Sequence, residues 1–134
     1  MTDAHTTNTD PAARQDGNLI EVRDLRTHFF TDRGVVAAVD GVSFSVPYGK
    51  TIGIVGESGS GKSVTARSLM QLVDDPGRIV SGSIDLNRPD GSRVDIAQLD
   101  PHGREMRSIR GAEISLIFQE PMAALSPVHT IGDQ

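Results

Sequence analysis

The stretch GESGSGKSV, residues 56–64, places three glycines within six positions and follows them with a lysine and a serine. It stands directly behind the apolar run TIGIV, residues 51–55. Glycine loses more conformational freedom on folding than other residues, so a glycine cluster indicates a backbone that passes where side chains would collide. The stretch fits G-x-x-x-x-G-K-[ST], in which successive backbone N–H groups surround phosphate oxygens at the start of a helix. The sequence therefore predicts a phosphate-binding loop.

Each part of this loop has a physical task. Gly59 and Gly61 allow the N–H groups to turn inward, where the positive end of the following helix also favours an anion. Lys62 can extend to the β- and γ-phosphates, and the Ser63 hydroxyl can coordinate Mg²⁺. The expected ligand is a nucleoside triphosphate with its metal. A chance match with the flanking strand and helix is rare, and the rival dinucleotide fingerprint G-x-G-x-x-G does not occur.

Composition narrows the class of protein. The chain has 134 residues, a formal net charge of −5 and a pI near 5.2. Its basic residues are scattered and outnumbered, which argues against a nucleic-acid partner. The absence of cysteine excludes disulfides and thiolate metal sites. The histidines lack the spacing of metal ligands; they are His5, His28, His102 and His129. Residues 1–18 are polar, and we expect a disordered leader there.

Periodicity predicts the elements that surround the loop. Residues 19–30 and 35–46, separated by the turn TDRG, are typical of a β-hairpin. Residues 51–55 predict a short buried strand that leads into the loop. A helix is expected behind the loop, because apolar residues recur there at helical spacing; they are Ala66, Leu69, Met70 and Val73.

The second half of the chain predicts three more elements. Residues 83–86 and 93–96 flank the turn-rich NRPDG and suggest a second hairpin. A helix is expected to open at Asp100, as N-cap before a proline, and to close near Ile109. The apolar run EISLIF, residues 113–118, predicts a strand.

These residues together resemble one family, the ATP-binding subunits of ABC transporters, and within it the branch that serves oligopeptide, dipeptide and nickel importers. The resemblance covers residues 19–134. It is carried by VDGVSFSVPYGKTIGIVGESGSGKSVTARSLM, by SGSI, and by RGAEISLIFQEPMAALSPVHTIGDQ. It implies an α/β fold, namely a P-loop NTPase core with an N-terminal antiparallel β subdomain, here incomplete.

The resemblance also implies roles for individual residues. Phe29 matches the aromatic residue that stacks on adenine, with Phe30 as the alternative. The competing interpretation is that both phenylalanines are only core residues of the hairpin. Gln119 matches the Q-loop glutamine, which contacts Mg²⁺ and the attacking water and whose loop touches the membrane subunit. Lys62 and Gln119 are thus the catalytic candidates, and Ser63 and Gln119 the metal ligands. The remaining nucleotide contacts are expected from Gly56, Glu57, Ser58, Gly59, Ser60, Gly61 and Val64. Val64 departs from the family's usual threonine.

Other parts of the family's site are missing from the sequence. The metal-binding aspartate and catalytic glutamate of the Walker B motif, the switch histidine, the signature motif and the helical subdomain are not found. We therefore expect the chain to be the first part of a longer subunit, to lack ATPase activity by itself, and to expose strand faces that leave it marginally stable.

The implied function is ATP binding, and in the full-length subunit ATP hydrolysis, that powers import of peptides or related small solutes. The implied partners are membrane permease subunits, a second ATP-binding subunit and, indirectly, an extracytoplasmic solute-binding protein, with the subunit peripheral on the cytoplasmic face of the cell membrane. A non-catalytic nucleotide-binding fragment is the first alternative. A P-loop GTPase would need N-K-x-D, which does not occur, and Arg104, Arg107 and Arg110 imitate a kinase lid only loosely.

Overall fold

The computed structural model describes residues 17–119 together with residues 128, 130 and 132. The expected leader, residues 1–18, therefore lies outside the described residues except at its end, where Asn18 already belongs to the first strand. Most of the segment after Gln119 lies outside them as well.

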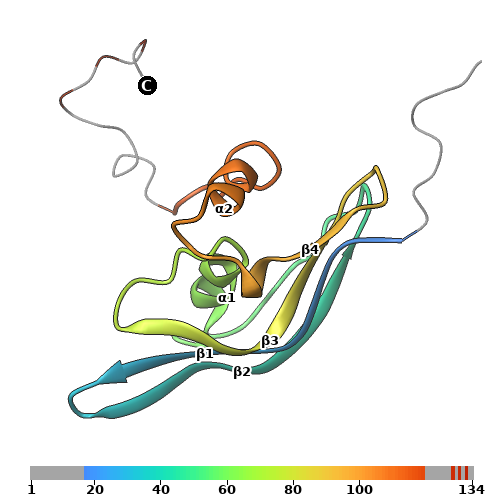
Figure 1. Ribbon diagram of the computed structural model, residues 1–134. Coiled ribbons are helices and arrows are strands. Elements are labelled where there is room, and N and C mark those ends of the chain that lie inside the picture. The colour runs from blue at the N-terminus through green and yellow to red at the C-terminus, as the bar shows by residue number, and fades with distance from the viewer. Residues whose placement is uncertain (1–16, 120–127, 129, 131, 133–134) are drawn as a thin grey trace, which may run out of the picture.

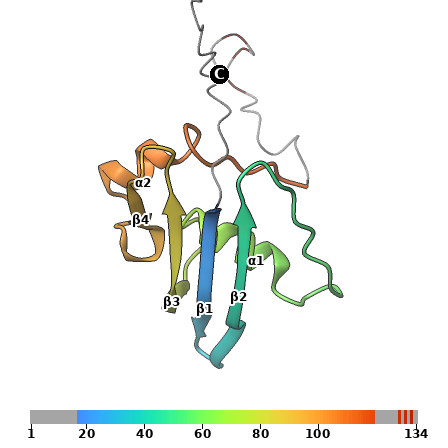
Figure 2. The same ribbon diagram turned by 90° about the vertical axis from the view of Figure 1, so that its right-hand side faces the viewer.

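An antiparallel sheet of four strands makes up most of the described chain (Figure 1). Its strands lie in the order β2-β1-β3-β4, with bounds β1 (Asn18–Thr31), β2 (Gly34–Pro47), β3 (Gly77–Asn87) and β4 (Arg93–Asp95). Figure 2 shows β1 between β2 and β3. Both predicted hairpins are confirmed, although β3 begins earlier than expected.

Three short helices complete the described fold, namely α1 (Lys62–Leu69), the 3-10 helix η1 (Ile96–Gln98) and α2 (Arg104–Ile109). α1 and α2 lie on the same side of the sheet, with α1 next to the strands and α2 further out (Figure 1). The buried apolar cluster fills the space between sheet and helices. Its members are Ile20, Val22, Leu25, Val39, Ile84, Leu86, Ile96, Met106 and Ile109.

A bulge in the middle of β1 keeps its buried side chains on one face. Ile20 and Val22 are buried in strict alternation, but the next buried positions, Leu25 and Thr27, come one residue later than alternation would place them. Asp24 takes up the extra residue with a φ of 47°, and the register shifts between Val22 and Leu25. Gly82 on β3 faces this bulge, where a Cβ would lie 2.5 Å from the Asp24 carbonyl oxygen. A glycine is required there because the two backbones approach closely.

A buried polar pair seats α1 on the sheet. The hydroxyls of Thr27 on β1 and Ser68 on α1 lie 2.8 Å apart, and both side chains are buried. Ser68 donates its proton to the carbonyl of Val64 at 2.8 Å, so Thr27 must be the donor to Ser68. The predicted helix is thus confirmed, but polar residues form part of its buried face, and Val73 lies beyond its end.

The β3–β4 hairpin is pinned by a buried carboxylate. Asp85 is 1% exposed and accepts from Arg23 on β1 at 2.9 Å and from Arg93 on β4 at 2.7 Å. In the turn between β3 and β4, the Arg88 guanidinium donates to both carboxylate oxygens of Glu113, at 2.8 and 3.0 Å. The hydrogen bonds to Glu113 raise the pKa of Arg88 above its usual value. This hairpin is therefore tied both to the sheet and to the turn that follows α2.

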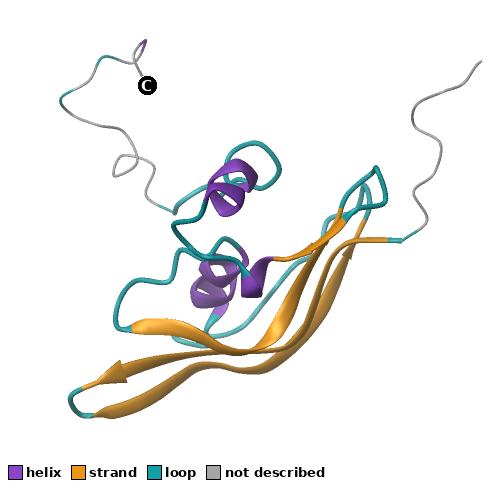
Figure 3. Cartoon of the chain, in the orientation of Figure 1, coloured by secondary structure: helices purple, strands orange, loops and turns teal. Residues whose placement is uncertain are grey.

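Two predicted strands are wrong within the described chain. Residues 51–55 and 113–118 form no strand, apart from a single bridge between Arg110 and Ile114; Figure 3 shows loop from the end of β2 to α1. Val55 is 92% and Ile117 93% exposed. A short apolar strand of a parallel sheet gains its hydrogen bonds from neighbouring strands, and the described residues supply none. The parallel sheet of the expected α/β core is accordingly not found among them.

The start of α2 also differs from the prediction. Gly103 is its N-cap, while the Asp100 carboxylate accepts from the backbone N–H of His102 at 2.9 Å and so closes a turn ahead of the helix. The predicted end at Ile109 is confirmed.

Candidate functional site

The glycine loop lies between β2 and α1 and leads into the first turn of the helix. Gly59 and Gly61 have φ values of 81° and 88°, in the left-handed region that favours glycine. A Cβ on Gly61 would lie 2.3 Å from the carbonyl oxygen of Ala38 on β2. Gly61 must therefore be a glycine both for its φ and for its contact with the sheet. This requirement agrees with the sequence prediction that the loop backbone passes where side chains would collide.

Lys62 curls back over the loop that precedes it. Its Nζ donates to the carbonyl oxygens of Gly56 at 2.8 Å and Glu57 at 2.6 Å, and to the Ser60 hydroxyl at 3.2 Å. The ammonium group thus lies among three oxygen acceptors contributed by the loop itself. Phosphate oxygens are stronger acceptors than carbonyls because they are charged, so Lys62 is placed to exchange these partners for an anion.

Ser63 and Val64 occupy the first turn of α1 and differ in environment. Ser63 is exposed, and within the described chain its hydroxyl makes no hydrogen bond, whereas the neighbouring Thr65 hydroxyl is held by the Gly61 carbonyl at 3.0 Å. The Ser63 oxygen is therefore available as a metal ligand. Val64 is half-buried and packs against the apolar cluster, which gives the valine at this position a role in packing.

A small cavity accompanies the loop. Its volume is about 170 Å³, and Ala38 and residues 59–64 line it. Sites that enclose a whole small molecule have volumes of about 300–1,000 Å³, so this cavity suits only a part of a nucleotide, such as its phosphates. The first turn of α1 has no acidic residue, and nothing there repels an anion. The donor set, an ammonium group, a free hydroxyl and a helix N-terminus, fits a phosphate chain with Mg²⁺.

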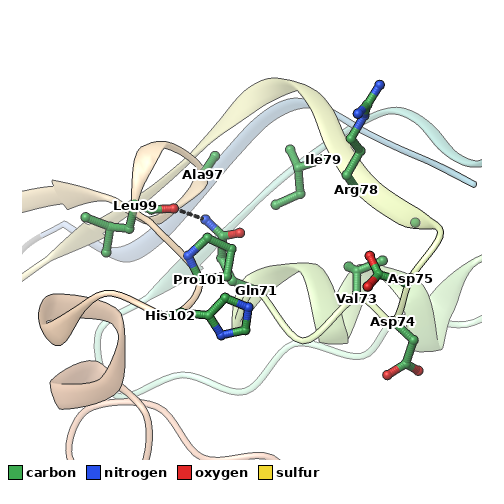
Figure 4. Close-up of a pocket in the computed structure, with 11 residues that line it drawn as sticks. Gln71, Val73, Asp74, Asp75, Arg78, Ile79, Ala97, Leu99, Pro101 and His102 are labelled. Carbon is green, nitrogen blue, oxygen red and sulfur yellow. Dashed lines mark hydrogen bonds between the residues drawn. The ribbon is translucent and has the colours of Figure 1, made fainter.

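A larger cavity of about 570 Å³ lies at the other end of α1 (Figure 4). Carboxylates, an arginine, a histidine and apolar side chains line it, among them Asp74, Asp75, Arg78, His102, Ile79 and Leu99. The two carboxylates would repel a polyanionic ligand. The guanidinium of Arg78 already stacks on the ring of Phe30, with its Cζ 4.2 Å from the ring centroid. We therefore place the candidate site at the loop and not in this larger cavity.

The two phenylalanines of β1 lie on opposite faces of the strand. Phe29 is half-buried and pairs with Gly77 on β3, where a Cβ would lie 2.6 Å from the Phe29 ring. Phe30 is 38% exposed and carries the Arg78 contact. Phe29 thus has a packing role against β3, and adenine stacking by Phe29 or Phe30 stays a prediction.

Gln119 is exposed at the end of the continuous described segment. Among the described residues, no hydrogen bond joins its side chain to the glycine loop. The exposed run before it supplies no strand to hold it, so its contact with Mg²⁺ stays a prediction. The roles of Glu57 and Ser58, both exposed in the loop, stay predictions as well.

Sequence reasoning missed several residues that position the site. Ala38 lines the cavity from β2, and Thr27 hydrogen-bonds Ser68 on α1. Arg110 donates to the carbonyls of Met70 and Gln71, just past the last residue of that helix. A threonine at a buried strand position signals a buried hydrogen bond. Within the described residues there is no group of three or more acidic or histidine side chains suited to a metal, and no helix there is long and apolar enough to cross a membrane.

Known proteins resemble the chain over most of its length. A probable peptide ABC transporter ATP-binding protein of Sinorhizobium fredii is 45% identical over 117 residues, which are 87% of this chain and 33% of that protein. The oligopeptide transport ATP-binding protein AppD of Bacillus subtilis is 46% identical over 117 residues, 87% and 34% of the two chains. The glutathione import ATP-binding protein GsiA of Escherichia coli is 45% identical over 119 residues, 88% and 19%.

The chain therefore spans about a third of the length of two of these relatives and about a fifth of the third. The family model described as ABC transporter matches residues 39–134, a range that begins on β2 and includes the glycine loop, α1 and Gln119. With the loop geometry, a match over more than half of the sequence establishes that this chain belongs to the ABC transporter family.

Proposed function

We propose that this chain binds ATP with Mg²⁺ at residues 56–64. The observation that carries the proposal is the position of Lys62, whose ammonium group lies among loop oxygens at the N-terminus of a helix free of acidic residues in its first turn. Gly56, Gly59 and Gly61 give the backbone its path around the phosphates. Lys62 neutralises their charge and Ser63 supplies an oxygen to the metal.

Two further residues complete the proposed site. Gln119 would bring its amide oxygen to the metal and orient a water molecule, and Phe29 would contact the base. When bound, Mg²⁺ offsets charge on the phosphates. The residues of this chain bind and orient, and the chain by itself does not hydrolyse ATP.

In the subunit to which residues 19–134 belong, we propose that ATP binding and hydrolysis power the import of peptides or related small solutes. The names of the relatives support this substrate class. The proposed partners are permease subunits, a second ATP-binding subunit and, through the permease, an extracytoplasmic solute-binding protein. The subunit would then lie at the cytoplasmic face of the membrane, held there by its partners.

Titration of the chain with a fluorescent ATP analogue in the presence of Mg²⁺ tests the nucleotide site. We expect binding that Lys62→Ala weakens by about 10- to 100-fold, since a hydrogen bond to a charged group contributes about 1.5–3 kcal/mol. Lys50→Ala is the matched control, because Lys50 is the other lysine of the chain and is exposed. Equal affinity of Lys62→Ala and wild type would refute the site.

Phosphate release tests whether the chain hydrolyses ATP by itself. We expect release at the background rate from the chain alone, and a rate that Lys62→Ala abolishes would show that these residues suffice for hydrolysis. Competition by GTP as strong as by ATP would favour a different P-loop class.

A further inference from the structure

The C-terminal end of α1 is held by an arginine from outside the helix. The last carbonyls of a helix have no partner within it and need donors from elsewhere. Arg110, which directly follows α2, donates from Nε to the Met70 carbonyl at 2.8 Å and from Nη2 to the Gln71 carbonyl at 2.8 Å. Its third nitrogen, Nη1, donates to the Pro101 carbonyl at 2.9 Å. One guanidinium group thus joins the end of α1 to the segment before α2.

The side chain of Gln71 makes a second connection between the end of α1 and the segment before α2. Its side-chain Nε2 donates to the carbonyls of Ile96 at 2.6 Å and Leu99 at 2.8 Å, and Figure 4 shows the side chain reaching Leu99. Its φ is 52°, an unfavourable value for a residue with a Cβ, which persists only where surrounding contacts hold it. That backbone turn also presents the Gln71 carbonyl to Arg110. Arg110 and Gln71 therefore form a two-way clamp, which we call the α1 clamp.

The α1 clamp connects the helix that begins at the glycine loop with the start of the segment that leads to Gln119. At its front end α1 begins with Lys62 and Ser63. Arg110 stands directly before the segment 111–119 that ends in Gln119, and the Gly111 N–H returns to the Ile114 carbonyl at 2.8 Å to fix the start of that segment. α1 is a single short helix, so its two ends move together. Fixing its C-terminal end to Arg110 therefore fixes where segment 111–119 starts relative to the glycine loop.

We propose that Arg110 is a positioning residue that sets Gln119 relative to the phosphate loop by clamping the end of α1. The inference rests on the proposed nucleotide site and adds a residue to it. A planar guanidinium group carries donors on three nitrogens held in a fixed fork, which can reach three separate carbonyls, whereas lysine directs all its donors from a single nitrogen on a flexible chain. The positive charge also suits the negative end of the helix dipole.

The test compares nucleotide affinity with and without metal, using a fluorescent ATP analogue in Mg²⁺ or in EDTA. Lys62 acts on the phosphates directly, whereas Gln119 would act through the metal. We therefore expect Arg110→Ala to reduce the gain in affinity that Mg²⁺ provides by about tenfold and to change the affinity in EDTA by less than about twofold. Arg110→Lys should restore only part of the gain.

The matched control is Arg107→Ala, an exposed arginine of α2 whose side chain makes no hydrogen bond or ion pair with the described residues. A double-mutant cycle supplies the second readout. Gln119→Ala should reproduce the loss seen in Arg110→Ala, and the double variant should lose no more than either single variant.

The outcomes separate the inference from the proposed function. Absence of binding by the wild-type chain overturns both. Binding that depends on Lys62 but is equal in Arg110→Ala and Arg107→Ala overturns the inference alone. Additive losses in the double variant, equal losses with and without Mg²⁺, or unfolding of both Arg110 variants by circular dichroism make Arg110 a residue of general stability and also overturn it.

Discussion

At the scale of single residues, the loop separates positions that are fixed by backbone geometry from positions that are free for chemistry. Gly61 is fixed by its left-handed φ and by the Ala38 carbonyl. Ser63 is exposed and its hydroxyl is available, while Lys62 is already drawn over the loop. This division lets substitutions in one loop report on folding and on binding separately.

Gly61→Ala should destabilise the chain more than Gly59→Ala. Both glycines have left-handed φ values, which cost a residue with a Cβ about 1–2 kcal/mol. The added Cβ at Gly61 also collides with the Ala38 carbonyl at 2.3 Å, whereas nothing lies within 4 Å at Gly59. Urea unfolding of the two variants measures the difference, and equal stabilities would mean that the loop does not lie against β2.

Ser63→Ala should weaken nucleotide binding only when metal is present. We expect a loss of about tenfold with Mg²⁺ and little change in EDTA, because the hydroxyl is proposed to bind the metal and not the phosphates. Ser108→Ala, at an exposed serine of α2, is the control and should match wild type under both conditions. A loss in EDTA as large as in Mg²⁺ would contradict the metal role. Titration of the fluorescent analogue measures all four affinities.

At the scale of elements, polar contacts connect parts that the apolar cluster alone would not align. The Thr27–Ser68 pair joins β1 to α1, Asp85 joins β3 to its neighbours through two arginines, and the α1 clamp joins the helix to α2. Apolar packing is non-directional, whereas a buried hydrogen bond fixes one orientation. The Thr27–Ser68 pair and the α1 clamp therefore set the angle at which α1 presents the loop.

Thr27→Val tests the join between β1 and α1. The valine keeps the shape but removes the donor to Ser68, so we expect a loss of about 1 kcal/mol in the free energy of unfolding. Ser68→Ala should cost a similar amount, and the double variant less than the sum, because the two hydroxyls bond each other at 2.8 Å. Thermal or urea unfolding measures the cycle. Full additivity would show that the pair contributes nothing as a pair.

At the scale of the whole molecule, the described chain leaves two apolar segments without a sheet partner. Ile54, Val55, Ile117 and Phe118 are exposed, with Val55 at 92% and Ile117 at 93%. Large apolar side chains exposed next to one another along a segment favour binding to other protein or aggregation. The cluster between sheet and helices must alone support the fold.

We accordingly expect the chain in isolation to be marginally stable and prone to self-association. Its free energy of unfolding should fall below the about 5 kcal/mol at the lower end of ordinary domains. The double variant Val55→Ser/Ile117→Ser should associate less, measured by light scattering over a concentration series. Val35→Ser, at another exposed valine on β2 (59%), should associate like wild type. A cooperative unfolding transition of about 5 kcal/mol or more in a monomeric chain would contradict the prediction.

The sequence by itself determined the glycine loop, the helix behind it and both hairpins, because glycine spacing, helical periodicity and strand alternation are local signals. The β1 bulge is also visible in the sequence, because two polar residues, at positions 23 and 24, separate the buried Val22 from the buried Leu25. The tertiary structure decided that residues 51–55 and 113–118 form no strand, because a strand exists only with partners that donate and accept its hydrogen bonds. It also decided the contacts of Thr27, Ala38 and Arg110 with the site, which join residues distant in the sequence and leave no periodic trace in it.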